Sequence, residues 1–200
     1  MAVAAVLTLG ACKATGGGQI DEPVESGVID PISGLDDIRG DFTGEANFGF
    51  NFTCEMTAKN KAVIKGQITY HDTGTSVIHV PVNPALPAGD TVETDFPEIR
   101  IHGTVDPMYY NVATCELAAD AFLDAAVIRG NYRSQDPSLT SVMSGRFDVL
   151  VFDQGEPGVS RDPAFETGDG FAIELNGGPY TLYTRAGYIE GGNIQVRGSK

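Results

Sequence analysis

Short segments in which apolar and polar residues alternate constrain the fold of this chain more than any other feature. In the clearest of them, Ala46, Phe48, Phe50 and Phe52 are separated by polar residues or glycine. A period of two residues is typical of a β-strand with one buried face. With 25 glycines and 11 prolines in the chain, turns should be frequent and helices few.

Similar segments recur at regular spacing and predict an all-β fold. The other expected strands are 63–70, 76–82, 98–105, 127–133, 146–152, 171–175, 180–185 and 189–196. We expect 63–70 and 76–82 to pair as a hairpin. Residues 110–124 fit either a short helix or strands around an alanine-rich turn, and the β character of their neighbours favours strands. About nine or ten short strands predict an antiparallel sandwich or barrel.

The length of 200 residues supports one domain with one core. Residues 1–12 are an apolar segment that ends in Leu-Gly-Ala-Cys, which resembles a lipoprotein signal but has no preceding basic residue. Residues 13–43 are rich in glycine and acidic side chains and predict a flexible tether. Residues 44–200 then form the single β domain.

The three cysteines indicate an oxidising compartment outside the cytoplasm. If Cys12 carries lipid, Cys54 and Cys115 remain to form one disulfide. That bridge would close a loop of about 60 residues and contribute about 3–4 kcal/mol in the chain-entropy model. The alternative is a small buried strand at residues 1–12 with a free thiol. We expect an extracellular or outer-surface protein anchored through lipid.

The charge of the chain limits its partners. Its 13 basic and 27 acidic side chains give a net charge of −14, which repels nucleic acid and anionic lipid. We therefore expect no nucleic-acid partner, and membrane contact only through the lipid anchor. The expected partner is a surface component or a glycan that the sequence does not identify, and a homo-oligomer is a further alternative.

Carboxylates concentrate in the segment 145–175, between two expected strands. Asp153, Glu156, Asp162 and Asp169 are candidate ligands for Ca²⁺, which takes six to eight oxygen ligands. No EF-hand spacing is present, and acidic residues beside glycine and proline are also ordinary turn formers. We favour the turn interpretation and keep calcium as the one candidate cofactor.

No assembled catalytic motif accompanies these features. Pairs of carboxylates are compatible with glycoside hydrolysis, but the sequence fixes neither their separation nor their pKa values. His71, His79 and His102 lack zinc-site spacing, and no nucleophile elbow is present. The chain is therefore interpreted as a non-enzyme.

Several segments together resemble the post-COAP domain of secreted bacterial surface proteins. They are KATGGGQI (13–20), ANFGF (46–50), GQITYHD (66–72), FDVLVFDQGEPG (147–158), DGFAIEL (169–175) and GGNIQV (191–196). The resemblance covers the chain from Lys13 onward, and the EPG turn and the terminal GGNIQ are its most specific parts. The chain departs from the pattern in a longer 81–95 loop and an insertion at 159–168. The resemblance implies an extracellular β module and carries no activity.

The leading hypothesis is a non-catalytic extracellular or lipid-anchored β module with a structural or recognition role at the cell surface. Three alternatives remain open. They are a β-barrel that binds a small ligand, a surface subunit that self-assembles through its N-terminal strand, and a carboxylate-dependent polysaccharide hydrolase.

Overall fold

The structure is a computed structural model that describes residues 11–20, 39–42, 44–57, 59, 61–74, 76–81, 91–96, 98–110, 124–139, 143–153 and 168–197. Its strands are β1 (Ala11–Ile20), β2 (Arg39–Phe42), β3 (Ala46–Met56), β4 (Ala62–Asp72), β5 (Ser76–Pro81), β6 (Thr91–Phe96), β7 (Ile99–Val105), β8 (Asp124–Ser134), β9 (Ser144–Asp153), β10 (Gly170–Asn176), β11 (Tyr183–Tyr188) and β12 (Gly191–Arg197). Two short 3-10 helices, η1 (Pro107–Tyr109) and η2 (Gly178–Tyr180), complete the described elements. Among these residues no helix has the length and hydropathy to cross a membrane.

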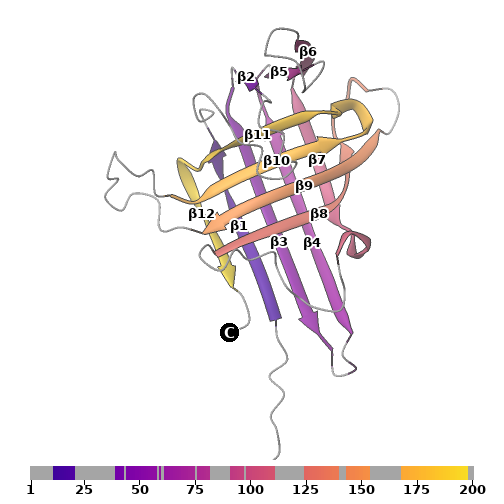
Figure 1. Ribbon diagram of the computed structural model, residues 1–200, viewed down its shortest axis with the longest axis vertical. Coiled ribbons are helices and arrows are strands. Elements are labelled where there is room, and N and C mark those ends of the chain that lie inside the picture. Colours follow the sequence, from indigo (N-terminus) through magenta and orange to yellow (C-terminus); the bar gives the residue numbers. More distant parts are fainter. Residues whose placement is uncertain are drawn as a thin grey trace, which may run out of the picture.

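The predicted all-β antiparallel fold is confirmed. Nine strands form one sheet in the order β11-β10-β9-β8-β7-β4-β3-β1-β12, and β2, β5 and β6 form a small second sheet. The large sheet curls into a half-barrel, so that β8–β11 cross in front of β12, β1, β3, β4 and β7 (Figure 1). We call these the front layer and the back layer. Each strand therefore has one face towards the interior and one face outward.

Two glycines allow the sheet to turn from the back layer into the front layer. Gly103 on β7 and Gly130 on β8 lie at the only backbone pairing between the two layers in the described sheet. A side chain at either position would collide with the ring of Phe147, which fills the inside of this bend. Bends of this kind require close backbone approach, which glycine permits.

The core lies between the two layers and is rich in aromatic rings. Phe171 on β10 stacks on Phe48 of β3 with 3.8 Å between ring centroids, and also on Tyr70 of β4 at 6.1 Å. All three rings point into the interior and are at most 7% exposed. Aromatic packing across the interior thus holds the two layers together.

The tether prediction for 13–43 is wrong at residues 13–20, which belong to β1, and at 39–42, which form β2. Strand β1 lies inside the back layer, paired with β3 on one side and β12 on the other. Its inward glycines, Gly16 and Gly18, leave room for the rings of Phe50 and Phe48. A glycine-rich sequence resembles a linker, but here neighbouring strands supply the side chains that the glycines lack.

The predicted hairpin of 63–70 with 76–82 is also wrong. Both segments are strands, but β4 pairs with β3 and β7, whereas β5 pairs with β2 and β6 in the small sheet. Sequence neighbours in an all-β fold pair often but not always. The turn between them carries the chain from one sheet to the other.

A buried arginine connects β11, one edge strand of the large sheet, to the back layer. Arg185 on β11 donates from Nη2 to the backbone oxygens of Ile20 at 3.1 Å and Gly44 at 2.7 Å. Its Nη1 lies 3.0 Å from Oδ2 of Asp72, and both side chains are fully buried. The same Asp72 oxygen accepts a hydrogen bond from the hydroxyl of Tyr183 at 2.7 Å. Side chains therefore make the connection here that backbone pairing makes elsewhere in the sheet.

The two tyrosines of this buried cluster remain protonated. Burial, together with the nearby Asp72 carboxylate, raises the pKa of Tyr70 above its usual range. Burial likewise raises the pKa of Tyr183, whose hydroxyl is hydrogen-bonded to that of Tyr70. The two tyrosines are therefore neutral hydrogen-bonding groups beside the ion pair of Asp72 and Arg185.

Candidate functional site

Two of the four candidate calcium ligands, Asp153 and Asp169, lie beside β12, which is an edge strand of the large sheet. Oδ2 of Asp169 accepts a hydrogen bond from the backbone N–H of Ile194 at 2.7 Å. Oδ2 of Asp153, at the end of β9, accepts one from the N–H of Val196 at 2.9 Å. Carboxylates therefore satisfy backbone donors along an edge that has no strand partner.

This arrangement gives Asp153 and Asp169 a structural role. Glu156 and Asp162 lie outside the described residues, so the four-carboxylate calcium site stays a prediction. Within the part of the chain that the structure describes, no three His, Cys, Asp or Glu side chains come together as a metal site.

Replacing Asp169 by alanine is expected to lower the free energy of unfolding by about 1.5–3 kcal/mol, the range for hydrogen bonds to charged groups. Asp169 is 1% exposed, so the N–H of Ile194 would lose its acceptor without gaining water. The Ile194 amide should also exchange its hydrogen faster in native-state exchange measured by NMR. Asp169→Asn, which keeps an acceptor oxygen, is the control. Unchanged exchange in the alanine variant would contradict the edge-capping role.

The cysteines are only partly described. Cys54 lies on the inner face of β3, 2% exposed, and the backbone register pairs it directly with Cys12 on β1. Cys115 lies outside the described residues. The Cys54–Cys115 disulfide and the lipidation of Cys12 therefore stay predictions.

The outward face of the back layer is the most distinctive polar surface of the described residues. Cross-strand neighbours form rows of amides, hydroxyls and glycines on it: Thr15–Asn51–Gln67–Thr104, Gly17–Gly49–Thr69–His102 and Gln19–Asn47–His71–Arg100. We call this surface the polar face. The amides and hydroxyls of these rows offer both donors and acceptors without a charge, and Arg100 adds a cation at one end.

A groove of about 340 Å³ lies on the polar face over β3, β4 and β7. Its polar lining comes from Asn47, Thr69, His71, Arg100 and Gln135, and Gly49 leaves its floor without a side chain. The register accounts for this grouping, because His71 is paired with both Asn47 and Arg100. The groove is therefore a product of sheet pairing among three strands.

The carboxylate of Glu98 holds two side chains of the groove lining, His71 and Arg100, in place. Nε2 of His71 donates to Oε1 of Glu98 at 2.6 Å, and Nη2 of Arg100 donates to the same oxygen at 2.9 Å. All three side chains remain at least one-third exposed. Ion pairs at such positions contribute little to stability, but they hold the imidazole and guanidinium in place beside the groove.

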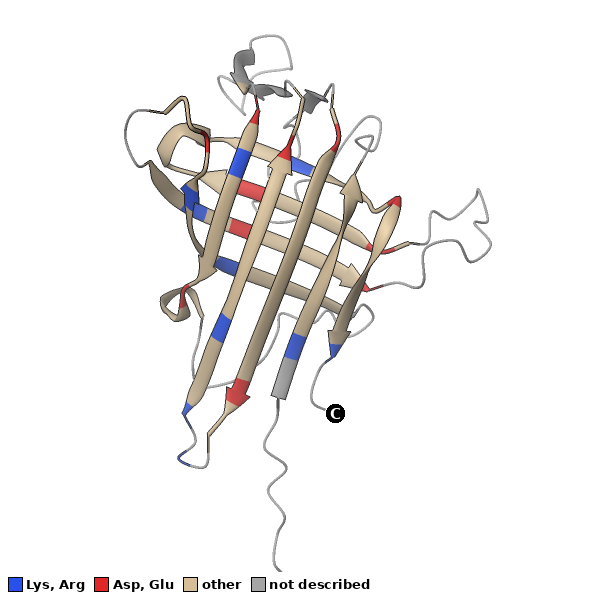
Figure 2. Cartoon of the chain, turned by 180° about the vertical axis from the view of Figure 1, so that it is seen from behind, with Lys and Arg blue, Asp and Glu red and all other residues tan. Residues whose placement is uncertain are grey.

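One end of the polar face carries a local charge opposite to that of the whole chain. Lys13, Lys65 and Arg197 project there, with Glu55 as the outward carboxylate of the same strands. At the other end Arg100 lies beside Glu98, and Glu45 precedes β3. In Figure 2 most basic segments of these strands lie towards the lower end, and acidic segments mark the upper ends. The basic character is thus confined to one end of the polar face.

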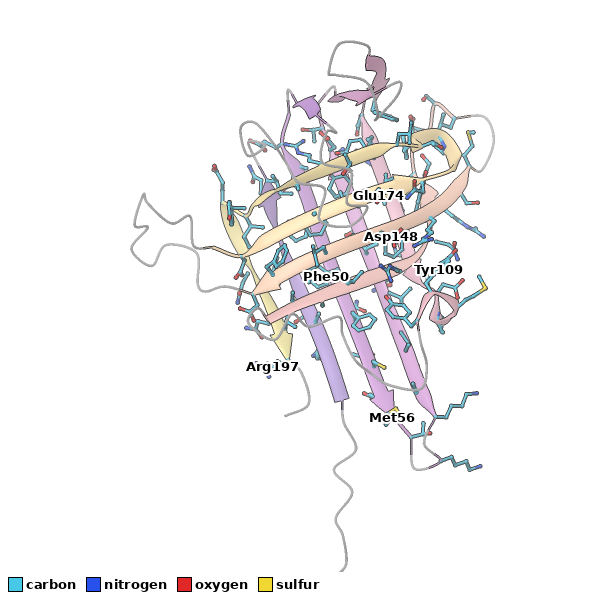
Figure 3. All side chains as sticks on the ribbon, viewed as in Figure 1. Phe50, Met56, Tyr109, Asp148, Glu174 and Arg197 are labelled. Atoms are coloured by element: carbon cyan, nitrogen blue, oxygen red, sulfur yellow. The ribbon has the colours of Figure 1, made fainter. Side chains whose placement is uncertain are left out.

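The outward face of the front layer holds a second charged cluster, which is largely self-satisfied. Asp148 accepts from Nε of Arg129 at 2.8 Å and from Nη2 of Arg146 at 2.7 Å. The guanidinium of Arg146 also lies 4.6 Å from the ring centroid of Tyr109. Figure 3 shows Asp148 beside Glu174, its register partner on β10, with Tyr109 at the same end. These groups engage one another, so we place the candidate site on the polar face.

Sequence reasoning missed the groove. The alternating pattern identifies Asn47, Gly49 and Asn51 as outward positions of one strand, and His102 and Arg100 as outward positions of another. The missing information was the strand order, which brings β3, β4 and β7 together. The prediction that His71, His79 and His102 lack a shared metal site stays a prediction, because the side chain of His79 lies outside the described residues.

Comparison of the chain with protein-family models, with curated proteins and with solved structures found no match. A function for the chain therefore has to be argued from the geometry of the polar face and its groove.

Proposed function

We propose that this chain is a non-catalytic recognition module of the cell surface that binds a polysaccharide through the polar face. The observation that carries the proposal is the groove of about 340 Å³ in which amide, hydroxyl, imidazole and guanidinium groups gather around Gly49, with Phe48, Tyr70 and Ile101 completing its lining. Sugar hydroxyls both donate and accept hydrogen bonds, so neutral side chains with both capacities match them. A broad, flat sheet face also suits an extended chain.

The interior offers less support for a ligand than the polar face does. Between the layers, buried rings such as Phe48, Tyr70 and Phe171 contact one another, and this packing favours an external ligand over a molecule held inside the barrel. Beside the groove, Glu98 is engaged by His71 and Arg100, and this favours binding over acid–base catalysis.

Export and anchoring belong to the same proposal. A lipid on Cys12 would attach the module at β1, while a bridge from Cys54 would stabilise it outside the cytoplasm. Directly paired antiparallel residues lie about 4.5–5.5 Å apart at Cα, a separation that a disulfide spans, so Cys12 is a second candidate partner for Cys54. The intact mass of the native protein distinguishes a lipidated Cys12 from a bridged one.

Replacing Gly49 by leucine is expected to weaken polysaccharide binding by about tenfold or more, because the side chain fills the floor of the groove. A Cβ at this position would meet only Oγ1 of Thr69, at an ordinary 3.5 Å, so the fold should tolerate the change. The measurement is affinity electrophoresis through gels that contain laminarin, xylan, dextran, alginate or xanthan.

The matched control is Gly168→Leu, two residues before β10 of the front layer, where an added Cβ would meet only Cδ1 of Tyr188, at an ordinary 3.9 Å. It makes the same substitution away from the polar face. The proposal predicts retarded migration for wild type and Gly168→Leu, and loss of retardation for Gly49→Leu at an unchanged melting temperature. Equal retardation of both variants, or no retardation of wild type by any polymer, would contradict it.

A further inference from the structure

We propose that the polysaccharide recognised by the polar face is largely neutral but carries spaced carboxylate groups, as in polymers with occasional uronic acids. This inference rests on the proposed function and specifies its ligand class. It follows from the number, the sign and the spacing of the charges on this one surface.

The polar face and its continuation on β8 concentrate basic side chains. Five of the 13 Lys and Arg residues of the chain project there. They are Lys13, Lys65, Arg100, Arg133 and Arg197. Glu55 is the described carboxylate nearest to Lys13 and Lys65 in the register. At the other end, Glu98 is paired with Arg100, Asp136 also lies near Arg100, and Asp106 accepts from Asn131 on β8. The end that carries Lys13, Lys65 and Arg197 is thus net basic in a protein of net charge −14, and charge complementarity there favours an anionic group on the ligand.

The bases lie in two separate groups. The register places Arg197 and Lys13 side by side, with Lys65 two strands further along the same row, beyond Thr53 of β3. Arg100 and Arg133 lie towards the other end, next to His71 and His102 respectively. Lys65 and His71 are six residues apart on β4, which corresponds to about 20 Å at the usual rise of about 3.3 Å per residue. Amides, hydroxyls and glycines occupy the rows between the two groups.

This spacing matches sparse charge rather than dense charge. Double-stranded DNA carries one negative charge per about 1.7 Å, and proteins that bind it cluster their basic residues against successive phosphates. Here two small groups of cations are separated by rows of neutral hydrogen-bonding groups, and the rest of the chain is acidic. A polymer whose hydroxyls contact the neutral rows, and whose occasional carboxylates reach the basic groups, satisfies both features.

The test compares each acidic polymer with its own neutral form. Xanthan and gellan, whose uronic acids are spaced by neutral sugars, are used beside the same polymers after chemical reduction of their carboxyl groups to alcohols. Affinity electrophoresis of the full chain should show retardation by at least one acidic polymer, with binding about tenfold weaker to its reduced form. Added NaCl should weaken this difference, because salt screens exposed charges.

Matched variants locate the effect. The double variant Lys13→Gln, Lys65→Gln should lose most of the preference for the acidic form while it keeps binding to the reduced polymer. The control Lys59→Gln, Lys61→Gln removes the same charge at the turn between β3 and β4 and should behave as wild type. Equal binding of acidic and reduced polymers overturns the charge inference and leaves the proposed function standing. Failure of every polymer overturns both, and stronger binding to DNA or to anionic vesicles overturns the inferred ligand.

Discussion

Replacing Arg185 by methionine is expected to lower the free energy of unfolding by about 3–5 kcal/mol, the cost of leaving a buried charge without its partner. The change removes the cation from Asp72, which is 0% exposed. It also removes the donor of the backbone oxygens of Ile20 and Gly44, through which β11 is tied to the back layer. The measurement is equilibrium unfolding in urea.

Two further variants make the result interpretable. Arg185→Lys keeps the charge but offers a single amine in place of a fork, so an intermediate loss is expected. Arg133→Met is the matched control, because Arg133 is exposed on β8 and its replacement should change stability by about 0.5 kcal/mol or less. A loss below about 1 kcal/mol for Arg185→Met would show that the buried pair does not close the sheet.

Most strands could be predicted from the sequence because apolar and polar residues alternate along each strand and so mark its buried and its exposed face. Inward and outward sides of β3, β4 and β7 follow directly from the alternation of apolar residues, for example Ile99, Ile101 and Val105. Burial of one face imposes the period of two on each strand separately, whatever its neighbours are. The all-β class therefore needed no knowledge of pairing.

Strand β1 could not be predicted by the same reasoning. Its inward positions include Gly16 and Gly18, whose missing side chains are replaced by the rings of Phe50 and Phe48 on the next strand. The apolar side chains that fill the space beside β1 therefore belong to β3, and the sequence of β1 does not show them. Pairing between distant segments also placed β12 beside β1 and separated β5 from β4, and neither is encoded in a local pattern.

The candidate site was less predictable than the fold. Asp153 and Asp169 were predicted as calcium ligands or turn residues, but their hydrogen bonds go to β12, which lies 43 and 25 residues away in sequence, respectively. The groove needs three strands from different parts of the chain in one register. Sequence reveals which residues face outward, but only the strand order reveals which of them share a surface.

Replacing Phe171 by alanine is expected to lower the free energy of unfolding by about 3–5 kcal/mol, the usual range for deleting a buried ring. Phe171 is 1% exposed and lies between the layers, stacked on Phe48 and Tyr70. The cavity left by the ring would face β3 and β4 at once, so both layers would lose contacts. Phe171→Leu should recover a large part of the loss, because it refills much of the volume.

The matched control for this cavity is Phe152→Ala on β9, where the ring is only partly buried on the outer face of the front layer. Because that ring is not enclosed between the layers, its loss should cost clearly less than the loss of Phe171. Urea unfolding of the three variants measures the difference. Equal losses at positions 152 and 171 would mean that the stability of the half-barrel comes from each layer separately. A much larger loss at 171 would mean that it comes from the aromatic contacts that join the two layers.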